Sequence, residues 1–244
     1  MPRFLVLLFI LSSSCLALPN NITIVTEQLP PYNYQEDGVM KGMSTEVLQA
    51  VLQELNLEVS IEVYPWARAY RMAKSNENVL IYSISRIPQR EELFKWVGVI
   101  APVSFGVFAL KKRPDIKATS LDELRPYRLA TVLGSAVDQY FTKEGFTNIV
   151  KSNSTEVLMK MFLLGRSDVW PVSKQTGIYA LKKAGISPSE TVREILKLKD
   201  FSSGNQYMAF SYSTKDHIVN QFRKALQKIK QKGIYQNIIE QYEN

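Results

Sequence analysis

The chain has 244 residues, of which 45% are hydrophobic and 22% are charged, a composition typical of a folded globular protein. Its formal net charge is +7 at pH 7. The lysines and arginines are spread along the chain without a basic run or an interleaved aromatic motif. We therefore expect no nucleic-acid partner, and a role of the positive charge in solubility or in mild attraction of anionic ligands.

The first residues have the layout of a secretory signal peptide. Arg3 precedes an apolar stretch from Phe4 to Leu11, small polar residues follow at Ser12 to Ser14, and Ala17 is a candidate cleavage-site residue. The apolar stretch is much shorter than the roughly 20 residues that a membrane-spanning helix needs. We expect residues 1–17 to be cleaved and the protein to be exported to the periplasm.

Cys15 is the only cysteine of the chain and lies within this segment. Cleavage after Ala17 would leave no thiol, which excludes disulfides and cysteine nucleophiles from the mature protein. The alternative is that Cys15 is a lipid attachment site. A lipidation signal has Leu three residues before its cysteine, whereas this chain has Ser12 there, so we favour an ordinary signal-peptide cysteine.

Strands and helices alternate after the leader. Residues 22–26 alternate apolar and polar side chains and are rich in β-branched residues, which predicts a strand. Apolar residues at helical spacing from Val47 to Leu55 predict a helix, with Ser44 and Thr45 as candidate caps. Further expected elements are a strand at 59–63, a helix at 66–73, and strands at 79–84 and 103–110. This alternation predicts a mainly parallel α/β sheet.

A second α/β series begins after a polar break at residues 111–114. Its expected strands are 128–132, 149–151 and 168–172, and its expected helices are 137–141, 155–164 and one that runs through residue 181. A return strand at 207–211 and a long helix from Asp216 come last. The apolar stripe of that last helix needs a partner surface, which we expect on the first sheet.

The chain is therefore expected to cross twice between two lobes, and two crossings make a hinge. We predict that residues 18–108 plus 208–244 form the first lobe and residues 109–207 the second lobe of a monomer.

Several local sequences, in their order and spacing, resemble the family 3 periplasmic solute-binding proteins, the amino-acid-binding components of ABC importers. The matching positions are Pro30-Pro31-Tyr32, Asp37-Gly38 with Gly42, Ser83-Ile84-Ser85 with Arg90, Gly134-Ser135, and Lys232-Gly233-Ile234-Tyr235. The resemblance implies a two-lobed α/β periplasmic-binding-protein fold (type II-like), in which each lobe is a mainly parallel sheet flanked by helices. It also implies a clamshell that captures a small polar, amino-acid-like or carboxylate-bearing ligand, and a membrane permease as partner.

The resemblance gives Arg90 the role of binding the ligand carboxylate. A guanidinium suits this role because its planar fork donates two parallel charge-assisted hydrogen bonds. The alternative is a surface arginine that pairs with Glu91 or Glu92. Ser83 and Ser85 are candidate ligand contacts from the same region, with ordinary strand-end serines as the alternative.

Four further candidates lie in loops that follow strands, where ligands bind in open α/β sheets. Ser135 at a helix start is expected to add a hydroxyl and free backbone N–H groups from the second lobe, or to act only as a helix cap. Trp66 and Tyr32 are candidates for an apolar wall of the site, with core packing as the alternative. Arg68 is either a second anion contact or a solvated helix residue.

The expected contact for a ligand ammonium group departs from the family pattern. Five residues beyond Asp168, where the family usually has an aspartate, this chain has Ser173. Glu27, directly after the first strand, is the remaining candidate carboxylate, with a surface glutamate as the alternative. This departure also leaves open a modified amino acid, an organic acid or another small polar ligand.

We expect no catalytic residues, no metal site and no cofactor. The chain has one histidine, no G-x-S-x-G motif and no phosphate-binding loop, so most nucleophilic and metal-dependent chemistries lack their usual residues. The alternatives are a ligand-sensing protein that signals to a receptor, and a dehydratase-type enzyme on the same fold, in which Glu27 would act as acid or base.

Overall fold

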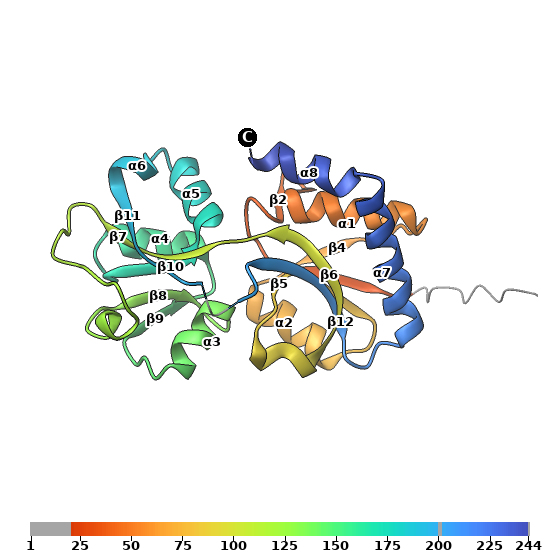
Figure 1. Cartoon of the computed structure of the whole chain (residues 1–244), viewed down its shortest axis with the longest axis horizontal. Helices are drawn as coiled ribbons and strands as arrows, with labels where there is room; N and C mark the ends of the chain where they lie inside the picture. The colour runs from red at the N-terminus through yellow and green to blue at the C-terminus, as the bar shows by residue number, and fades with distance from the viewer. Residues whose placement is uncertain (1–20, 200–201, 244) are drawn as a thin grey trace, which may run out of the picture.

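The computed structural model describes residues 21–199 and 202–243, which form two lobes that lie side by side (Figure 1). The predicted signal peptide, including Cys15, lies outside the described residues. Each lobe is built around one five-stranded sheet with helices on both faces. We call them the first lobe and the second lobe in chain order.

The first lobe contains the sheet β4-β1-β5-β12-β6. Its strands are β1 (Thr23–Thr26), β4 (Ile61–Val63), β5 (Val79–Ser85), β6 (Phe94–Pro102) and β12 (Asn205–Ser211). Its helices are α1 (Met43–Glu54), α2 (Trp66–Ser75), the 3-10 helix η1 (Pro88–Leu93), α7 (Asp216–Gln231) and α8 (Ile234–Glu243). A small hairpin of β2 (Tyr34–Glu36) and β3 (Val39–Lys41) precedes α1.

The second lobe contains the sheet β11-β7-β10-β8-β9. Its strands are β7 (Phe105–Leu110), β8 (Leu129–Val132), β9 (Ile149–Ser152), β10 (Val169–Ser173) and β11 (Val192–Lys197). Its helices are the 3-10 helix η2 (Asp122–Leu124), α3 (Ala136–Lys143), α4 (Thr155–Leu163), α5 (Lys174–Lys183) and α6 (Pro188–Thr191).

The two-lobed α/β fold is confirmed, with one refinement. Both sheets are mixed rather than mainly parallel, because β1 pairs in parallel with β4 and β5 whereas β12 runs antiparallel to β5 and β6. In the second sheet, β8 pairs in parallel with β9 and β10, and β7 runs antiparallel to β10 and β11. The antiparallel strands are those that follow or precede a crossing between the lobes.

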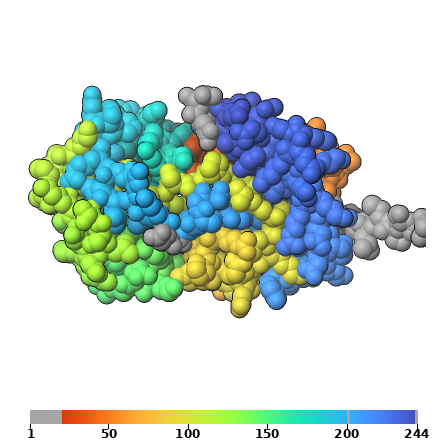
Figure 2. Space-filling model, in the orientation of Figure 1, coloured from red at the N-terminus to blue at the C-terminus, as the bar shows by residue number. Residues whose placement is uncertain are grey.

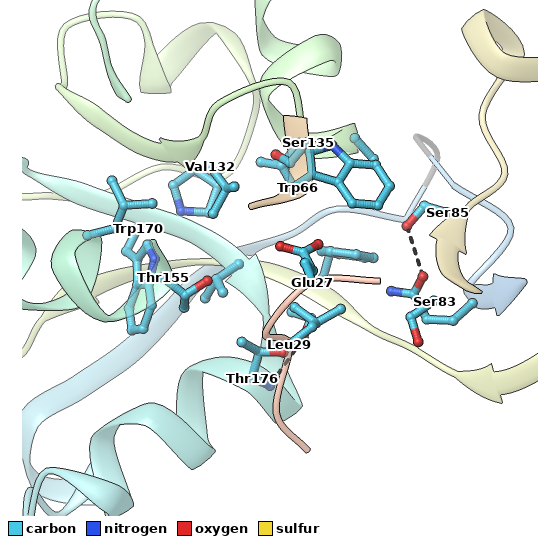
Figure 3. A pocket seen from close by; sticks show the side chains of 18 of the residues that line it. Glu27, Leu29, Trp66, Ser83, Ser85, Val132, Ser135, Thr155, Trp170 and Thr176 are labelled. Atoms are coloured by element: carbon cyan, nitrogen blue, oxygen red, sulfur yellow. Dashed lines mark hydrogen bonds between the residues drawn. The ribbon is translucent and has the colours of Figure 1, made fainter. Parts of the chain in front are cut away.

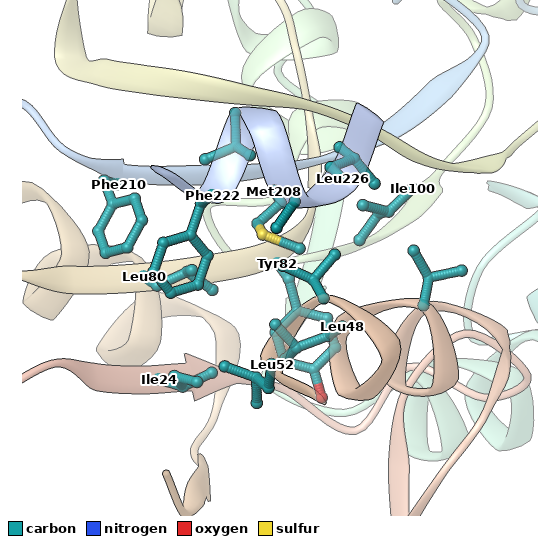
Figure 4. Close-up of a cluster of buried hydrophobic side chains, with 14 of the residues drawn as sticks. Ile24, Leu48, Leu52, Leu80, Tyr82, Ile100, Met208, Phe210, Phe222 and Leu226 are labelled. Carbon is teal, nitrogen blue, oxygen red and sulfur yellow. The ribbon is translucent and has the colours of Figure 1, made fainter. Parts of the chain in front are cut away.

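The predicted apolar stripe of α7 is fully buried and covers one face of the first sheet together with α1. Figure 4 shows Phe222 and Leu226 of α7 packed over Met208 and Phe210 of β12, with Leu48 of α1 beside them. Helix α2 covers the opposite face. This packing is the reason why the last helices belong to the first lobe.

Two adjacent segments connect the lobes, one between β6 and β7 and the other between β11 and β12. Val103 N donates a hydrogen bond to Gly204 O (3.0 Å), and Leu198 N donates to Phe105 O (3.0 Å), so the crossings run side by side. In the space-filling view the described residues of the second crossing lie at the surface between the lobes (Figure 2). The predicted boundary at residues 108–109 falls within β7, which pairs only with strands of the second sheet.

Within residues 21–199 and 202–243, no helix combines the length and the apolar character that crossing a lipid bilayer requires.

Candidate ligand-binding site

A cavity of about 80 Å³ lies between the two lobes and opens into an outer cleft of about 810 Å³. Four residues line both the cavity and the cleft: Glu27, Trp66, Thr155 and Thr176. The structure brings seven of the nine predicted site residues together on the cavity: Glu27, Trp66, Ser83, Ser85, Arg90, Ser135 and Ser173. Figure 3 labels the first four of these and Ser135.

Arg90 lies on η1, directly after β5, and only 1% of its surface is exposed. Its Nη1 donates to Ser85 O (3.2 Å) and its Nη2 donates to Gly134 O (3.3 Å). Burial lowers the pKa of Arg90 to about 10, which still leaves a cation at neutral pH. Glu91 pairs instead with Arg86 (2.8 Å), so the alternative of a surface arginine paired with Glu91 is wrong.

Ser83 occupies a β-bulge in the buried central strand β5. Tyr207 pairs with Ile84 and Met208 pairs with Tyr82, so Ser83 is the extra residue between two ladder positions. Its φ of 58° lies in the left-handed region, which is uncommon for residues other than glycine. Such bulges re-aim side chains near functional sites. Here the buried Ser83 Oγ lies on the cavity without a hydrogen-bond partner in the described parts of the chain.

The other serine of β5 has a partner. Ser85 Oγ donates to Oε1 of Gln206 at a distance of 3.5 Å. Gln206, from the return strand β12, also lines the cavity and was not among the predicted site residues. Sequence alone gives no signal for it, because only the antiparallel pairing of β12 with β5 brings it beside Ser85.

Glu27 follows β1 and projects toward the middle of the cavity (Figure 3). Burial raises the pKa of Glu27 to about 8, although the Arg90 cation acts in the opposite direction. The loop is fixed by Asn33, whose Nδ2 donates to Glu27 O (2.7 Å) and to Thr26 Oγ1 (2.8 Å). The surroundings of Glu27 therefore favour the protonated form of its carboxyl group.

Two serines of the second lobe are N-caps as well as cavity residues. Ser135 Oγ accepts a hydrogen bond from Asp138 N (3.2 Å) at the start of α3, and Ser173 Oγ accepts one from Thr176 N (3.1 Å) at the start of α5. A hydroxyl that accepts a hydrogen bond can still donate its own proton. Both serines therefore combine the capping role with a position on the cavity.

The carbonyl of Gly134 connects the lobes. It accepts hydrogen bonds from Trp66 Nε1 (2.8 Å), from Arg90 Nη2 (3.3 Å) and from Gln139 Nε2 (3.0 Å). The first two donors belong to the first lobe, whereas Gly134 and Gln139 belong to the second. Trp66 and Arg90 thus contact the cavity and the opposite lobe at the same time.

Tyr32 and Arg68 are not on the cavity. Tyr32 is completely buried, and its hydroxyl donates to Pro102 O (3.1 Å), so it packs beneath the crossing rather than facing the cavity. Arg68 is exposed, and its guanidinium lies 3.8 Å from the ring centroid of Tyr64. Residues two apart on a helix do not face the same side, so Arg68 points away when Trp66 points into the cavity.

The second lobe also contributes apolar residues that the sequence analysis did not assign to the site. Val132 comes from β8, Leu158 from α4, and Trp170 and Val172 from β10. The ring of Trp170 also packs on Phe162, with 5.8 Å between the ring centroids. Its second role on the cavity follows from tertiary packing, which single-sequence patterns do not reveal.

In the described residues, no group of three or more His, Cys, Asp or Glu side chains is placed to hold a metal ion. A model of the bacterial extracellular solute-binding proteins, family 3, matches residues 22–244. The chain belongs to this family. The family consists of binding proteins and not of enzymes, which is what the resemblance in the sequence implied.

Three known proteins are similar to this chain at low sequence identity. The probable amino-acid-binding protein YxeM of Bacillus subtilis (strain 168) is 23% identical over 226 residues, which cover 90% of this chain and 82% of YxeM. Among solved structures, a histidine kinase sensor domain with similarity to periplasmic binding proteins has a TM-score of 0.80 at 17% identity, covering 91% of this chain and 95% of that domain. An ancestral arginine-binding protein bound to arginine has a TM-score of 0.76 at 16% identity, covering 91% of this chain and 97% of that protein. At these identities the solved structures support the fold alone.

Proposed function

We propose that this family 3 solute-binding protein captures a small amino-acid-like carboxylate between its lobes and delivers it to an ABC importer in the periplasm. The observation that carries the proposal is a buried Arg90 cation on the interlobe cavity, beside the unpartnered hydroxyl of Ser83. A buried cation next to an unused donor matches an anionic ligand group, because burial of either group is costly without a partner.

The carboxylate would be held from both lobes. Arg90 and Ser83 would donate from the first lobe, and Ser85 would do so if its hydroxyl turned away from Gln206. The N-terminus of α3 with Ser135 would donate from the second lobe. Backbone N–H groups at a helix start favour an anion. Because these donors meet at one ligand group only when the lobes are closed, the ligand would stabilise the closed form by its differential affinity for the two forms.

The ammonium group of an amino acid would contact Glu27. A cation beside this carboxyl favours its ionised form, so a ligand ammonium would lower the raised pKa of Glu27 and release a proton on binding at neutral pH. An organic acid without an amino group would leave Glu27 protonated. Proton release therefore distinguishes the two ligand classes that the sequence leaves open.

Thermal unfolding of the purified protein in the presence of amino acids and their analogues tests the proposal. Because a ligand that binds only the folded state raises the midpoint, we expect a higher midpoint with at least one L-amino acid and no rise with the matching amino alcohol, which lacks the carboxylate. An equal rise with both compounds, or no rise with any carboxylate of a panel of amino acids and organic acids, would contradict carboxylate capture.

Ligand sensing is a second candidate, favoured by the similarity of fold to the histidine kinase sensor domain. Hinge closure around a ligand is the known motion of periplasmic binding proteins, and the same closure suits a permease or a receptor. Uptake of radiolabelled ligand by cells with and without the intact gene distinguishes the two roles. Loss of uptake supports delivery to an importer, and unchanged uptake supports sensing.

A further inference from the structure

The charges on the interlobe cavity are all on one side. Of the described residues that line it, only Glu27 and Arg90 carry ionisable side chains, and both belong to the first lobe. Figure 3 shows Ser83 and Ser85 at one end, Glu27 in the middle, and Val132, Thr155 and Trp170 at the other end. The carboxylate of a ligand would therefore lie among polar residues of the first lobe, and the rest of the ligand would face the uncharged second-lobe end.

The end of the cavity away from Ser83 and Ser85 lies in the second lobe, where it is lined by strands β8 and β10 and by helices α4 and α5. Val132, Leu158, Trp170 and Val172 form its apolar wall. Leu158 and Trp170 are also part of a buried hydrophobic cluster with Phe162 and Leu181, so the wall is continuous with the core of the lobe. A wall of this kind is held by close packing and does not rearrange easily to expose polar groups.

Gly177 lets α5 approach this wall closely. A Cβ atom at this position would lie 3.0 Å from Cγ1 of Val172 and 3.8 Å from the ring of Trp170. Two hydroxyl groups lie near the wall: Ser173 Oγ accepts the N–H of Thr176, and Thr176 Oγ1 is buried without a hydrogen-bond partner in the described parts of the chain. Both hydroxyls are uncharged. Nothing among the described lining residues of this lobe can neutralise a buried charge.

We propose that the second-lobe end of the cavity receives an uncharged, apolar group of the ligand, so that the ligand is a carboxylate with a compact aliphatic side group. This inference rests on the proposed function and specifies its ligand class. A charged side group placed there would lose its hydration without gaining an opposite charge, whereas an aliphatic group gains by leaving water. A compact group fits within the cavity of about 80 Å³, whereas a longer group would extend past Thr155 and Thr176 into the outer cleft.

Calorimetric titration of the purified protein with four L-amino acids tests the inference. Leucine, alanine, arginine and glutamate share the α-ammonium and α-carboxylate groups and differ only in the side chain. We expect L-leucine to bind at least tenfold more tightly than each of the other three. Equal or tighter binding of L-arginine or L-glutamate overturns the aliphatic-group inference but leaves carboxylate capture standing. No binding of any of the four, together with no binding of 4-methylpentanoate, overturns both.

Two variants locate the group in the second lobe. Val132→Thr and Val172→Thr keep the shape of the wall and add a hydroxyl, so each should weaken L-leucine binding about fivefold or more and leave L-alanine binding within twofold. Val157→Thr is the matched control, because Val157 lies on α4 with 46% of its surface exposed. If both cavity variants bind L-leucine as the unaltered protein does, or lose L-leucine and L-alanine affinity to the same extent, the group does not contact this wall.

Discussion

At the scale of single residues, two features of the cavity act against the stability of the fold. Ser83 has a left-handed backbone conformation in the middle of a buried strand, and its hydroxyl is buried on the cavity. Glu27 is a carboxyl group whose ionised form is disfavoured by its surroundings. Unfavourable local conformations persist where the surrounding structure holds them, and they cluster at functional sites.

The cost of the bulge at Ser83 can be measured with two variants that both remove the hydroxyl. Ser83→Gly tolerates the φ of 58° without a clash of Cβ, whereas Ser83→Ala does not. We expect Ser83→Ala to be less stable than Ser83→Gly by about 1 kcal/mol, measured as the free energy of unfolding in urea. A Ser83→Ala variant as stable as Ser83→Gly would show that the strand relaxes at this position.

Glu27 makes the stability of the protein depend on pH. Its pKa rises from 4.5 to about 8 on folding, so the protonated form contributes stability that is fully present below pH 4.5 and is lost as pH rises through 8. Glu27→Gln removes this loss. We expect its melting temperature to equal that of the unaltered protein near pH 4 and to exceed it by roughly 5 °C at pH 8. A constant difference between the two proteins from pH 4 to pH 8 would contradict this account.

At the scale of elements, the loop after β1 is held against the start of α1. Met43 N donates to Pro31 O (3.1 Å) and Ser44 N donates to Tyr32 O (2.8 Å). This approach requires a glycine, because a Cβ on Gly42 would lie 2.5 Å from Tyr32 O. The contact fixes the loop that carries Glu27 at its start, so α1 positions part of the cavity without touching it.

Gly42→Ala and Gly38→Ala separate this close approach from backbone strain. Both glycines have positive φ, 109° and 78°, but no atom lies within 4 Å of a Cβ placed on Gly38. We expect Gly38→Ala to lower the free energy of unfolding by about 1 kcal/mol and Gly42→Ala to lower it by more than about 2 kcal/mol, measured in urea. Equal losses would mean that the loop moves away from α1 at little cost.

Sequence patterns predict individual helices and strands but not how the strands pair. The spacing of apolar residues predicts α7 and α1, and β-branched runs predict β1 and β5, because both signals are local. The mixed order of each sheet was missed because it depends on which strands meet after a crossing. The same limit applies to the cavity. Motif resemblance indicates Arg90 and Ser83, whereas Gln206 and the apolar wall around Trp170 are brought there by tertiary packing.

At the scale of the whole molecule, the site exists only where the lobes meet. Arg90 Nη2 donates a hydrogen bond to Gly134 O of the second lobe, and residues of both lobes line the cavity. Ligand binding, closure and recognition by a permease or a receptor would then be linked, because one ligand group would contact both lobes. The division of the chain into residues 18–108 plus 208–244 and residues 109–207 stays a prediction that limited proteolysis can test.

The most direct test of carboxylate capture compares two arginines of the first lobe, Arg68 and Arg90. Calorimetric titration with the tightest-binding carboxylate should show one site in the unaltered protein and in Arg68→Ala, because Arg68 is exposed and contacts Tyr64 outside the cavity. In Arg90→Ala the affinity should fall at least a hundredfold, since a buried charge-assisted contact is lost. Unchanged affinity in Arg90→Ala, or an equal loss in both variants, would contradict the account of the site.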